Sequence, residues 1–512
     1  MNPLIPLFVA VPLGGAFLTM IIGKFLRNAN KYIGMTVLLF LMVISYISIT
    51  GLSGNISVYK VGGWEPVNGT PIGIYMVLDS LSAILLCIIN TIGFLSIVYS
   101  FTYIAQYTSE NYFYSLFCLM VAGMNGIVLS GDIFNIYIFL EISAISSYAL
   151  VAFGVEREQL EATFKYQVLG GLASMLILIG ISFIYWKAKT LNIADIKAAL
   201  GTNTAKSFYI PVQLLLLSGF GLKAAIIPFH AWLPDAHSSA PSPISAMLSG
   251  VLIKAAGIYV ILRLFFNMFI ITEDMAMLLT TLGALSMAVG VLLAIGQWDI
   301  KRLLAYHSIS QMGYVVMSAG IGMILLARGT KPEVASLAIA GGLFHLINHA
   351  AFKSLLFLNA GAIEYRTGTR DLKSMGGLAG LMPATSSTSF VASMAISGIP
   401  PFNGFFSKLI IIIAAIMGKF YFLAVIAVIV SIVTLASFMK FQRYAFYNKE
   451  IEKSENSPKE VPFPMVFSMV TLAVLCLVLS LIALPQVRDV ILTPAIRILT
   501  DSQLYTTSIT GM

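Results

Sequence analysis

Apolar residues recur along the chain in runs of about 20, separated by short polar stretches. One run of this length is enough for a helix that crosses a bilayer. The repeated pattern therefore predicts an all-α polytopic membrane protein. About fourteen transmembrane helices are expected, at residues 3–23, 32–51, 73–104, 112–131, 133–153, 164–187, 208–229, 242–268, 275–296, 302–325, 334–363, 384–418, 420–447 and 463–484.

Proline and glycine interrupt two of these runs. They read LKAAIIPFHAWLPDAHSSAPSP at 222–243 and SGIPPFNGFFSK at 397–408, in the seventh and twelfth helices. Proline removes a backbone donor and kinks a helix, so we predict that helices 7 and 12 are broken. Their separation by five helices indicates two similar five-helix units, an arrangement typical of transporters. The predicted segments are residues 1–111, 112–268, 275–447 and 463–512.

The composition excludes several classes of protein. Of the 512 residues, 58% are hydrophobic and 10% are charged, against about 25% charged in soluble domains. The net charge of +8 comes from scattered residues, which argues against nucleic acid as a partner. The three cysteines lie singly in apolar segments without a CxxC motif, so no iron–sulfur or structural zinc site and no other cofactor is expected.

The loops indicate how the chain lies in the membrane. The first apolar run follows Met1 without a basic segment, so we interpret it as the first helix and not as a signal peptide. Lysine and arginine are somewhat more numerous in the loops of one side, which predicts a cytoplasmic face there and both termini outside. Within the loop 187–206, the segment NIADIKAAL is expected to form a short amphipathic helix.

Charged residues also occur inside the apolar runs. Glu141 is in the middle of its predicted helix, and Asp79 is near the start of another. Five cations are assigned to apolar runs, all of them lysines: Lys165, Lys223, Lys254, Lys353 and Lys408. The other 25 cations are counted with the loops. Lys301 is among them, and so is Arg263, although it lies near the end of the run 242–268. An isolated charge at the bilayer centre costs about 2.5–3.5 kcal/mol. Lysine, unlike arginine, can release its proton, so the pattern indicates proton transport.

Histidines extend this pattern. His345, His349 and Lys353 follow one another at steps of four residues, which places them on one face of a helix. His307 lies on the preceding predicted helix, next to Tyr306 and Ser308. Imidazole titrates near neutral pH and exchanges protons through both ring nitrogens. We therefore expect a polar seam that relays protons.

Structural explanations remain open for some of these groups. Lys165 near a helix end is able to extend to the lipid headgroups, and Asp79 is able to cap a helix. His230 and His237 flank the WLPD turn, where they could satisfy freed backbone groups. The spacing of His345 and His349 also suits zinc, but the sequence offers no HExxH motif or third ligand, so no metal site is predicted.

Four long motifs carry a resemblance to a known family. They are LKAAIIPFHAWLPDAHSSAPSPISAMLSGVLIKAAGIY, DIKRLLAYHSISQMGY, HLINHAAFKSLLFLNAG and GIPPFNGFFSK. The chain resembles, over about residues 70–447, the antiporter-like membrane subunits of respiratory complex I, Mrp-type sodium/proton antiporters and membrane-bound hydrogenases. The segments AYHSISQMGY and GTRDLKSMGGL look closer to the Mrp D-type subunit and its hydrogenase counterpart than to complex I.

The resemblance implies a fold of fourteen helices with two inverted five-helix repeats. It also implies that Glu141 and Lys223 form a switch pair, that Lys254 is the central lysine, and that Lys408 is the terminal lysine with Lys353 beside it. His307, His345 and His349 match polar linkers. Beside the resemblance, His230 is a further candidate for the proton relay, and Asp79 and His237 are possible accessory residues.

By this resemblance, we expect a proton-translocating subunit of a multi-subunit complex in a prokaryotic cell membrane. Its partners would be other membrane subunits, the lipid bilayer, H⁺ and, as an open question, Na⁺. The alternatives are a stand-alone secondary transporter of an ion or small solute, and a pumping subunit of a complex I-type oxidoreductase. A redox enzyme in its own right would have to take its cofactors from other subunits.

Overall fold

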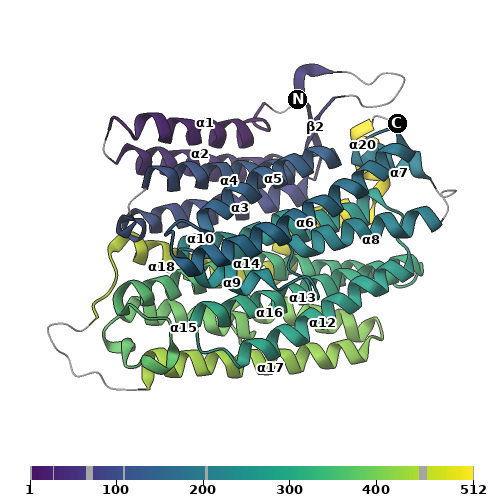
Figure 1. Ribbon diagram of the computed structural model, residues 1–512. Helices are drawn as coiled ribbons and strands as arrows, with labels where there is room; N and C mark the ends of the chain where they lie inside the picture. The colour runs from purple at the N-terminus through teal and green to yellow at the C-terminus, as the bar shows by residue number, and fades with distance from the viewer. Residues whose placement is uncertain are drawn as a thin grey trace.

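The computed structural model describes residues 3–26, 28–52, 54–64, 73–107, 110–201, 206–448 and 458–510. Most of its helices run roughly parallel to one another (Figure 1). Within the described ranges, eleven helices are long and apolar enough to cross a membrane, and three shorter apolar helices accompany them. The all-α polytopic fold is thus confirmed, whereas the count of about fourteen spans stays a prediction.

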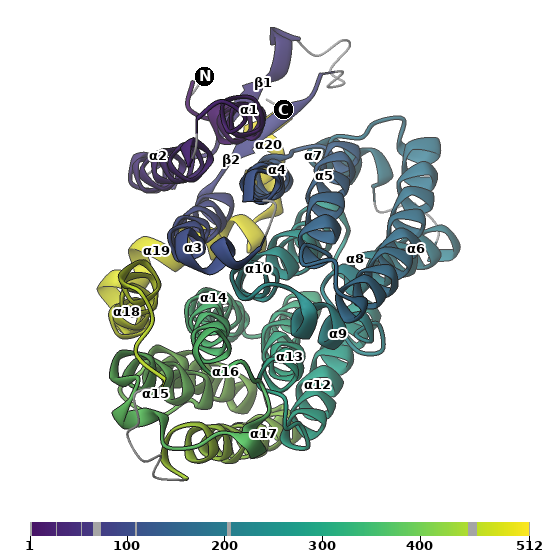
Figure 2. The same cartoon turned by 60° about the vertical axis from the view of Figure 1, so that its left-hand side comes forward.

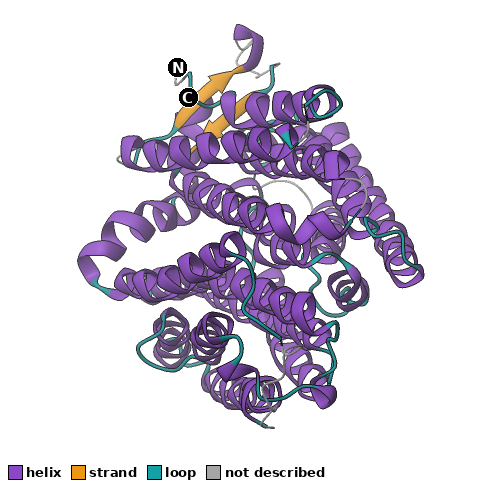
Figure 3. Cartoon of the chain, turned by 90° about the vertical axis from the view of Figure 1, so that its left-hand side faces the viewer, coloured by secondary structure: helices purple, strands orange, loops and turns teal. Residues whose placement is uncertain are grey.

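The N-terminal segment contains three helices and a β-hairpin. Its elements are α1 (Leu7–Ile22), α2 (Ala29–Leu52), β1 (Ser57–Lys60), β2 (Tyr75–Leu78) and α3 (Ser80–Tyr103). The strands are antiparallel, with Ser57 opposite Leu78, and stand at one end of the bundle (Figure 3). The predicted span 73–104 therefore begins too early, because its first residues form β2. A capping box of Asp79 and Ser82 starts α3, since each side chain accepts a backbone N–H of the other.

The next helices form the first unit. They are α4 (Glu110–Leu129), α5 (Ile133–Val151), α6 (Arg157–Ala188), α7 (Ile193–Leu200), α8 (Lys206–Lys223), α9 (Trp232–Ser239), α10 (Ser242–Met247) and α11 (Val260–Arg263). Three π-helical segments continue α10 and α11, at Leu248–Leu252, Lys254–Tyr259 and Leu264–Met268. Residues 224–231 separate α8 from α9, which confirms the predicted break in helix 7. The expected short helix is α7.

A second set of helices follows. They are α12 (Glu273–Ile295), α13 (Ile300–Ala327), α14 (Pro332–Thr367), α15 (Pro383–Ser397), α16 (Asn403–Met417) and α17 (Tyr421–Gln442). The break between α15 and α16 confirms the prediction for helix 12. It begins at Gly398, whose φ of +78° favours glycine. A π-helical turn, Arg443–Tyr447, ends α17. Single 3-10 turns occupy Ile104–Gln106, Leu372–Ser374 and Leu378–Gly380.

The C-terminal helices close the bundle against its N-terminal part. They are α18 (Phe463–Val478), α19 (Pro485–Thr500) and α20 (Ser502–Thr510), with a 3-10 turn at Leu479–Ala483. Helix α19 contacts α3 and α14, and α20 contacts α7. The two ends of the described chain lie at the same end of the bundle (Figure 1).

Helix α14 occupies the middle of the molecule. Viewed nearly along the helices, it is surrounded by α3, α10, α13, α16 and α18 (Figure 2). Glycines bring neighbouring helices close together: a Cβ atom on Gly313 of α13 would lie 2.3 Å from the backbone nitrogen of Met287 on α12. Small residues allow this approach where the hydrophobic effect does not drive helices together. The polar groups of α14 are therefore enclosed by protein.

Candidate functional site

Lys223 and Glu141 form an ion pair inside the first unit. Lys223 is the last residue of α8, directly before the break, and its Nζ lies 3.9 Å from Glu141 Oε1 on α5. The same amine approaches the hydroxyl of Tyr148 at 3.5 Å, and Ser174 donates a hydrogen bond to Glu141. At 3.9 Å the two charges are adjacent without a direct hydrogen bond. A cavity of about 10 Å³, close to the size of one water, adjoins Lys223.

Lys254 is completely buried in a π-helical stretch. Its Nζ donates to the carbonyl oxygen of Ser249 at 2.8 Å. The π geometry changes the backbone hydrogen-bonding pattern at this point, as is common at functional sites. The hydroxyl of Ser249 lies 2.7 Å from the hydroxyl of Ser308. Ser308 is next to His307, so this contact connects the first unit with α13.

The seam predicted on α14 is present and lies in the protein interior. His345, His349 and Lys353 are all fully buried. His345 contacts Ser407 Oγ at 3.0 Å through Nδ1 and Gln311 Oε1 at 3.1 Å through Nε2. Neither ring nitrogen of His349 has a hydrogen-bond partner within the described ranges. Lys353 donates to the carbonyl oxygen of Leu304.

Lys408 lies beside the second break. Its Nζ donates to the carbonyl oxygen of Ile396 at 2.8 Å and lies 3.3 Å from Ser431 Oγ. Its chain folds against Gly398, where a Cβ atom would lie 3.0 Å from Lys408 Cδ. The amine also sits 5.0 Å from the ring centre of Tyr314, a cation–π distance. The terminal carbonyls of a helix lack helical partners, so this ammonium group satisfies one of those freed by the break.

The residue directly before Lys408 contacts the seam on α14. Ser407 precedes Lys408 on α16 and contacts His345. The contact thus brings His345 to the start of α16. Lys353, two helical turns further along α14, donates instead to the carbonyl oxygen of Leu304 on α13. His307 reaches α17 through a 2.8 Å contact of its Nε2 with Ser437 Oγ.

The two histidines at the first break differ in their surroundings. His230 is partly buried, and its ring interacts with the backbone of Pro228, in line with the structural explanation. His237 is fully buried on α9, and neither of its ring nitrogens has a hydrogen-bond partner in the described part of the chain. Its ring packs edge-on against Phe357 at 5.4 Å. His237 therefore does not satisfy freed backbone groups, as one explanation required.

Asp79 serves as a structural anchor. It is fully buried, caps α3 and pairs with Arg263, whose Nη2 lies 2.8 Å from Asp79 Oδ2. The assignment of Arg263 to a loop is therefore wrong: its side chain is 1% exposed, and it lies between the rings of Tyr259 and Tyr505. An arginine enters the bundle here because a fully buried carboxylate neutralises it.

Two further lysines are held by carboxylates. Lys165 pairs with Glu161 at 2.8 Å and with Asp235 at 3.0 Å, so these pairs hold its amine at the protein surface. Lys301 is not a loop residue, because it is buried near the start of α13 and pairs with Glu364 on α14 at 2.8 Å. One signal for this pair is present in the sequence, since Lys301 directly borders an apolar run.

No cluster of three or more His, Cys, Asp or Glu side chains that could hold a metal occurs in the described ranges. The polar interior instead consists of buried amines, imidazoles and hydroxyls, several of them at hydrogen-bond distance from one another. Such groups can exchange protons directly or through one or two waters. Fold and site together define a polytopic membrane protein with a titratable row in its interior.

Family models identify the family. Residues 130–434 match the model described as "NADH:quinone oxidoreductase/Mrp antiporter, TM", and residues 64–114 match "NADH-Ubiquinone oxidoreductase (complex I), chain 5 N-terminus". The chain belongs to the NADH:quinone oxidoreductase/Mrp antiporter transmembrane family, and the resemblance seen in the motifs is confirmed.

Similar proteins come from several complexes. The chain is 34% identical over 508 residues to the D-type Na(+)/H(+) antiporter subunit of Alkalihalophilus pseudofirmus, covering 97% of this chain and 99% of the relative. It is 34% identical over 374 residues to the N-type NADH-quinone oxidoreductase subunit of Desulforudis audaxviator, covering 72% and 71%.

Solved structures agree. A chain of the Mrp complex from Dietzia sp. superposes with a TM-score of 0.89 at 27% identity, with full coverage of both chains. A chain of an archaeal membrane-bound sulfane sulfur reductase, a respiratory membrane complex, gives 0.88 at 28% identity, with 99% of each chain covered. Membership of a family found in multi-subunit membrane complexes is thus established by sequence and by fold.

Proposed function

We propose that this chain is the proton-translocating, antiporter-type subunit of a multi-subunit complex in a prokaryotic cell membrane. Near-complete coverage of a D-type Na(+)/H(+) antiporter subunit supports the D-type position. The ion pair of the buried Lys223 with the partly buried Glu141 is the observation that carries the proposal. This pair supplies both a proton carrier and a charge that can control it.

The Glu141–Lys223 distance acts as the switch. When the carboxylate lies close, it stabilises the ammonium form of Lys223. When the two separate, the buried ammonium loses that stabilisation, and its proton moves on to Lys254. The cavity beside Lys223 is lined by Leu252 and Ile253, the residues directly before Lys254. Moving one charge across the membrane requires about 2.3 kcal/mol of free energy per 100 mV. The free energy that one buried lysine gains or loses with its carboxylate partner is of the same size.

From Lys254 the proposed route continues through α13 and α14 to Lys408. The hydroxyls of Ser249 and Ser308 lead to His307, and His345 connects through Ser407 to the start of α16. His349 and Lys353 lie between these groups on α14. The route then ends at the second break, where Lys408 releases its proton. The interior relay thus runs from one broken helix to the other.

Transport measurements on the complete assembly test this function. Everted membrane vesicles that contain the complex, loaded with a ΔpH-sensitive dye, report proton flux when Na⁺ or an electron donor is added. We expect Glu141→Ala and Lys223→Ala to abolish the flux while the other subunits still copurify. Glu273→Ala is the matched control, because Glu273 pairs with Arg328 at an exposed site. Full flux in both switch variants would refute the proposal.

The parent complex is a separate question with its own test. Dequenching on addition of Na⁺ alone, together with copurification of other Mrp subunits, supports the antiporter. Copurified hydrogenase, reductase or iron–sulfur subunits would instead favour the respiratory type, in keeping with the reductase superposition. Transport by the purified chain alone in liposomes would favour the stand-alone transporter.

We also propose that both termini are extracytoplasmic. The described ends lie at one end of the bundle (Figure 1), and the basic residues Arg302, Arg366, Arg370 and Lys373 lie at the helix ends and loops of the other. Such residues favour the cytoplasmic side.

A further inference from the structure

The Lys301–Glu364 pair repeats the arrangement of the switch pair. The Lys301 side chain is 2% exposed and that of Glu364 28% exposed, compared with 6% for Lys223 and 30% for Glu141. In both pairs an enclosed amine meets a carboxylate that is only partly buried within the chain. At 2.8 Å the second ion pair is closer than the first, in which the charged atoms lie 3.9 Å apart.

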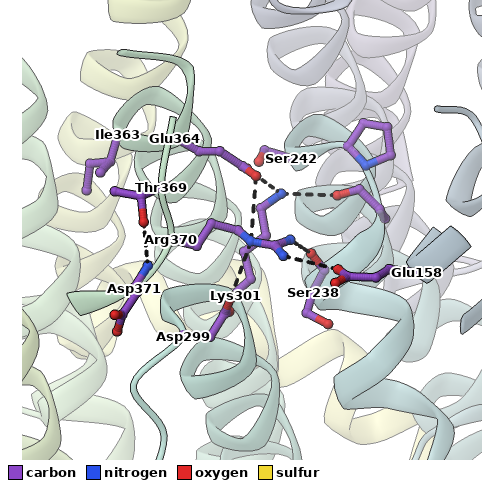
Figure 4. Close-up of polar contacts among 12 residues, drawn as sticks. Glu158, Ser238, Ser242, Asp299, Lys301, Ile363, Glu364, Thr369, Arg370 and Asp371 are labelled. Atoms are coloured by element: carbon purple, nitrogen blue, oxygen red, sulfur yellow. Dashed lines mark hydrogen bonds and ion pairs between the residues drawn. The ribbon is translucent and has the colours of Figure 1, made fainter. Parts of the chain in front are cut away.

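A large polar cavity reaches this pair from the end of the bundle opposite the termini. Its volume is about 610 Å³, and Lys301, Glu364 and Arg370 line it together with Tyr103 and Glu158. A space of this size lined by charged groups accommodates many waters. Figure 4 shows Lys301 and Glu364 pointing toward one another, with Arg370 beside them. Protons from bulk water therefore reach Glu364.

Two sets of hydrogen bonds to backbone carbonyl oxygens place Lys301 close to interior groups. Its Nζ donates to the carbonyl oxygen of Ala240 at 3.2 Å. Ser245 contacts that same oxygen at 3.3 Å and donates to the carbonyl oxygen of His237 at 2.8 Å. The second set lies on α13, where Leu304, one turn after Lys301, accepts the hydrogen bond of Lys353.

His237 stands between the pair and the seam. Its ring packs against Phe357 at 5.4 Å, and the amine of Lys353 lies 5.6 Å from the centre of the same Phe357 ring. The ring is fully buried, and its two nitrogens have no hydrogen-bond partner in the described ranges. A titratable ring with two free nitrogens is thus available next to Lys353.

We propose that Lys301 and Glu364 form the proton inlet of the row, with His237 as the link to Lys353. This inference rests on the proposed function. The Lys301 ammonium gives one proton, through interior water, to a ring nitrogen of His237 and becomes a neutral amine, and the His237 imidazolium passes that proton to the Lys353 amine. One proton from cavity water then binds the Glu364 carboxylate and passes to the amine, which restores the original charges. One proton enters for each proton passed on.

A structural role for the same cluster makes a different prediction. Arg370 contacts Asp299 at 3.3 Å, Glu364 at 3.6 Å and Glu158 at 3.7 Å, and it donates to the carbonyl oxygen of Ser238. These contacts join α6, the end of α9, and the loop after α14. If the cluster only holds these elements together, as a structural latch, it needs its charges but no proton transfer.

Lys301→Arg separates the two roles in the complete assembly. Arginine keeps the charge and the ion pair but stays protonated. The inlet predicts a loss of flux of roughly tenfold or more, with copurification of the other subunits intact, whereas a latch predicts unchanged flux. Glu273→Gln is the control for a paired, exposed carboxylate.

Glu364→Gln supplies an independent measurement. Without the carboxylate, proton capture becomes limiting when protons are scarce, so we expect flux to fall steeply between about pH 6 and pH 8 and Glu364→Asp to restore it. The charged and titratable groups that act on Glu364 are its ion-pair partners Lys301 and Arg370, with Tyr99, Tyr103 and Tyr107 close by. Asp299 and Glu158 pair with the same Arg370, and Glu156 lines the same cavity. A wild-type pH profile in Glu364→Gln, or wild-type flux in Lys301→Arg, overturns the inlet. If Glu141→Ala also keeps full flux, the proposed function fails with it.

Discussion

The buried pair of Asp79 and Arg263 offers the sharpest test of how this bundle is held together. Both side chains are buried, and one guanidinium nitrogen lies 2.8 Å and 3.0 Å from the two carboxylate oxygens. The pair joins the start of α3 to the end of the first unit. Asp79→Asn removes the charge while an amide oxygen can still cap α3. Arg263→Met removes the partner and keeps much of its volume.

The expected cost follows from what each variant leaves unpaired. Removal of one member of a buried ion pair typically costs about 3–5 kcal/mol, because the remaining charge stays enclosed without a partner. Arg263 also contacts Tyr259 and Asn267, and these contacts disappear in Arg263→Met alone and in the double variant. The double variant no longer buries a charge. We therefore expect its loss to be smaller than the sum of the single losses by about 2 kcal/mol or more.

The chain carries its own reporter for this measurement. Cys118 and Cys476 are fully buried, so a thiol-reactive fluorophore detects unfolding in detergent as temperature rises. Both single variants should lower the midpoint by several degrees, and the double variant should recover part of that loss. Strictly additive losses, or unchanged midpoints in both single variants, would refute the view of this pair as a structural anchor.

Two further predictions concern the fold. Burial raises the pKa of the Asp132 carboxyl from 3.8 to about 6, against the opposing effect of the N–H donated by Asn135. The folded protein thus holds this proton more tightly than the unfolded chain, so stability should fall as pH rises from about 4 to about 6. The thermal midpoint of Asp132→Asn should lack this decline over the same pH range. If the midpoint of the variant falls with pH as steeply as that of the wild type, the assignment is contradicted. Gly313→Leu should destabilise the α12–α13 contact by about 1–3 kcal/mol or more. Gly14→Leu is the control and should be neutral, because no atom lies within 4 Å of the new Cβ. Equal thermal midpoints of the two variants would show that the α12–α13 contact is not tight.

The sequence predicted the membrane-spanning helices and both breaks because hydropathy and proline act locally. It likewise identified Glu141, Lys223, Lys254 and Lys408, since a charge inside an apolar run is costly and therefore conspicuous. The roles of these residues remain proposals. Their long-range contacts, such as that of Ser407 with His345, depend on helix packing, which hydropathy does not encode.

The errors share one physical origin. Arg263 and Lys301 are assigned to loops from the sequence because charges near the ends of apolar runs resemble loop charges. Each is buried because a carboxylate from another helix or its cap neutralises it, Asp79 for Arg263 and Glu364 for Lys301. A buried charge thus needs a partner, and the search for one can begin from the sequence. Asp79 has no assigned partner among the nearby apolar runs, which is itself a sign that a buried cation remains to be found.

Broken helices and buried lysines are two aspects of one design. Lys408 donates to a carbonyl freed at the end of α15, and Lys254 donates to a carbonyl in a π-helical stretch. An ammonium group without a carboxylate needs acceptors, and most carbonyls inside a regular helix are already bonded within it, although Lys353 shares that of Leu304 in α13. The irregular backbone supplies them at the depth where they are needed. A substitution that makes either stretch regularly helical should therefore disturb its lysine as much as removal of the amine does.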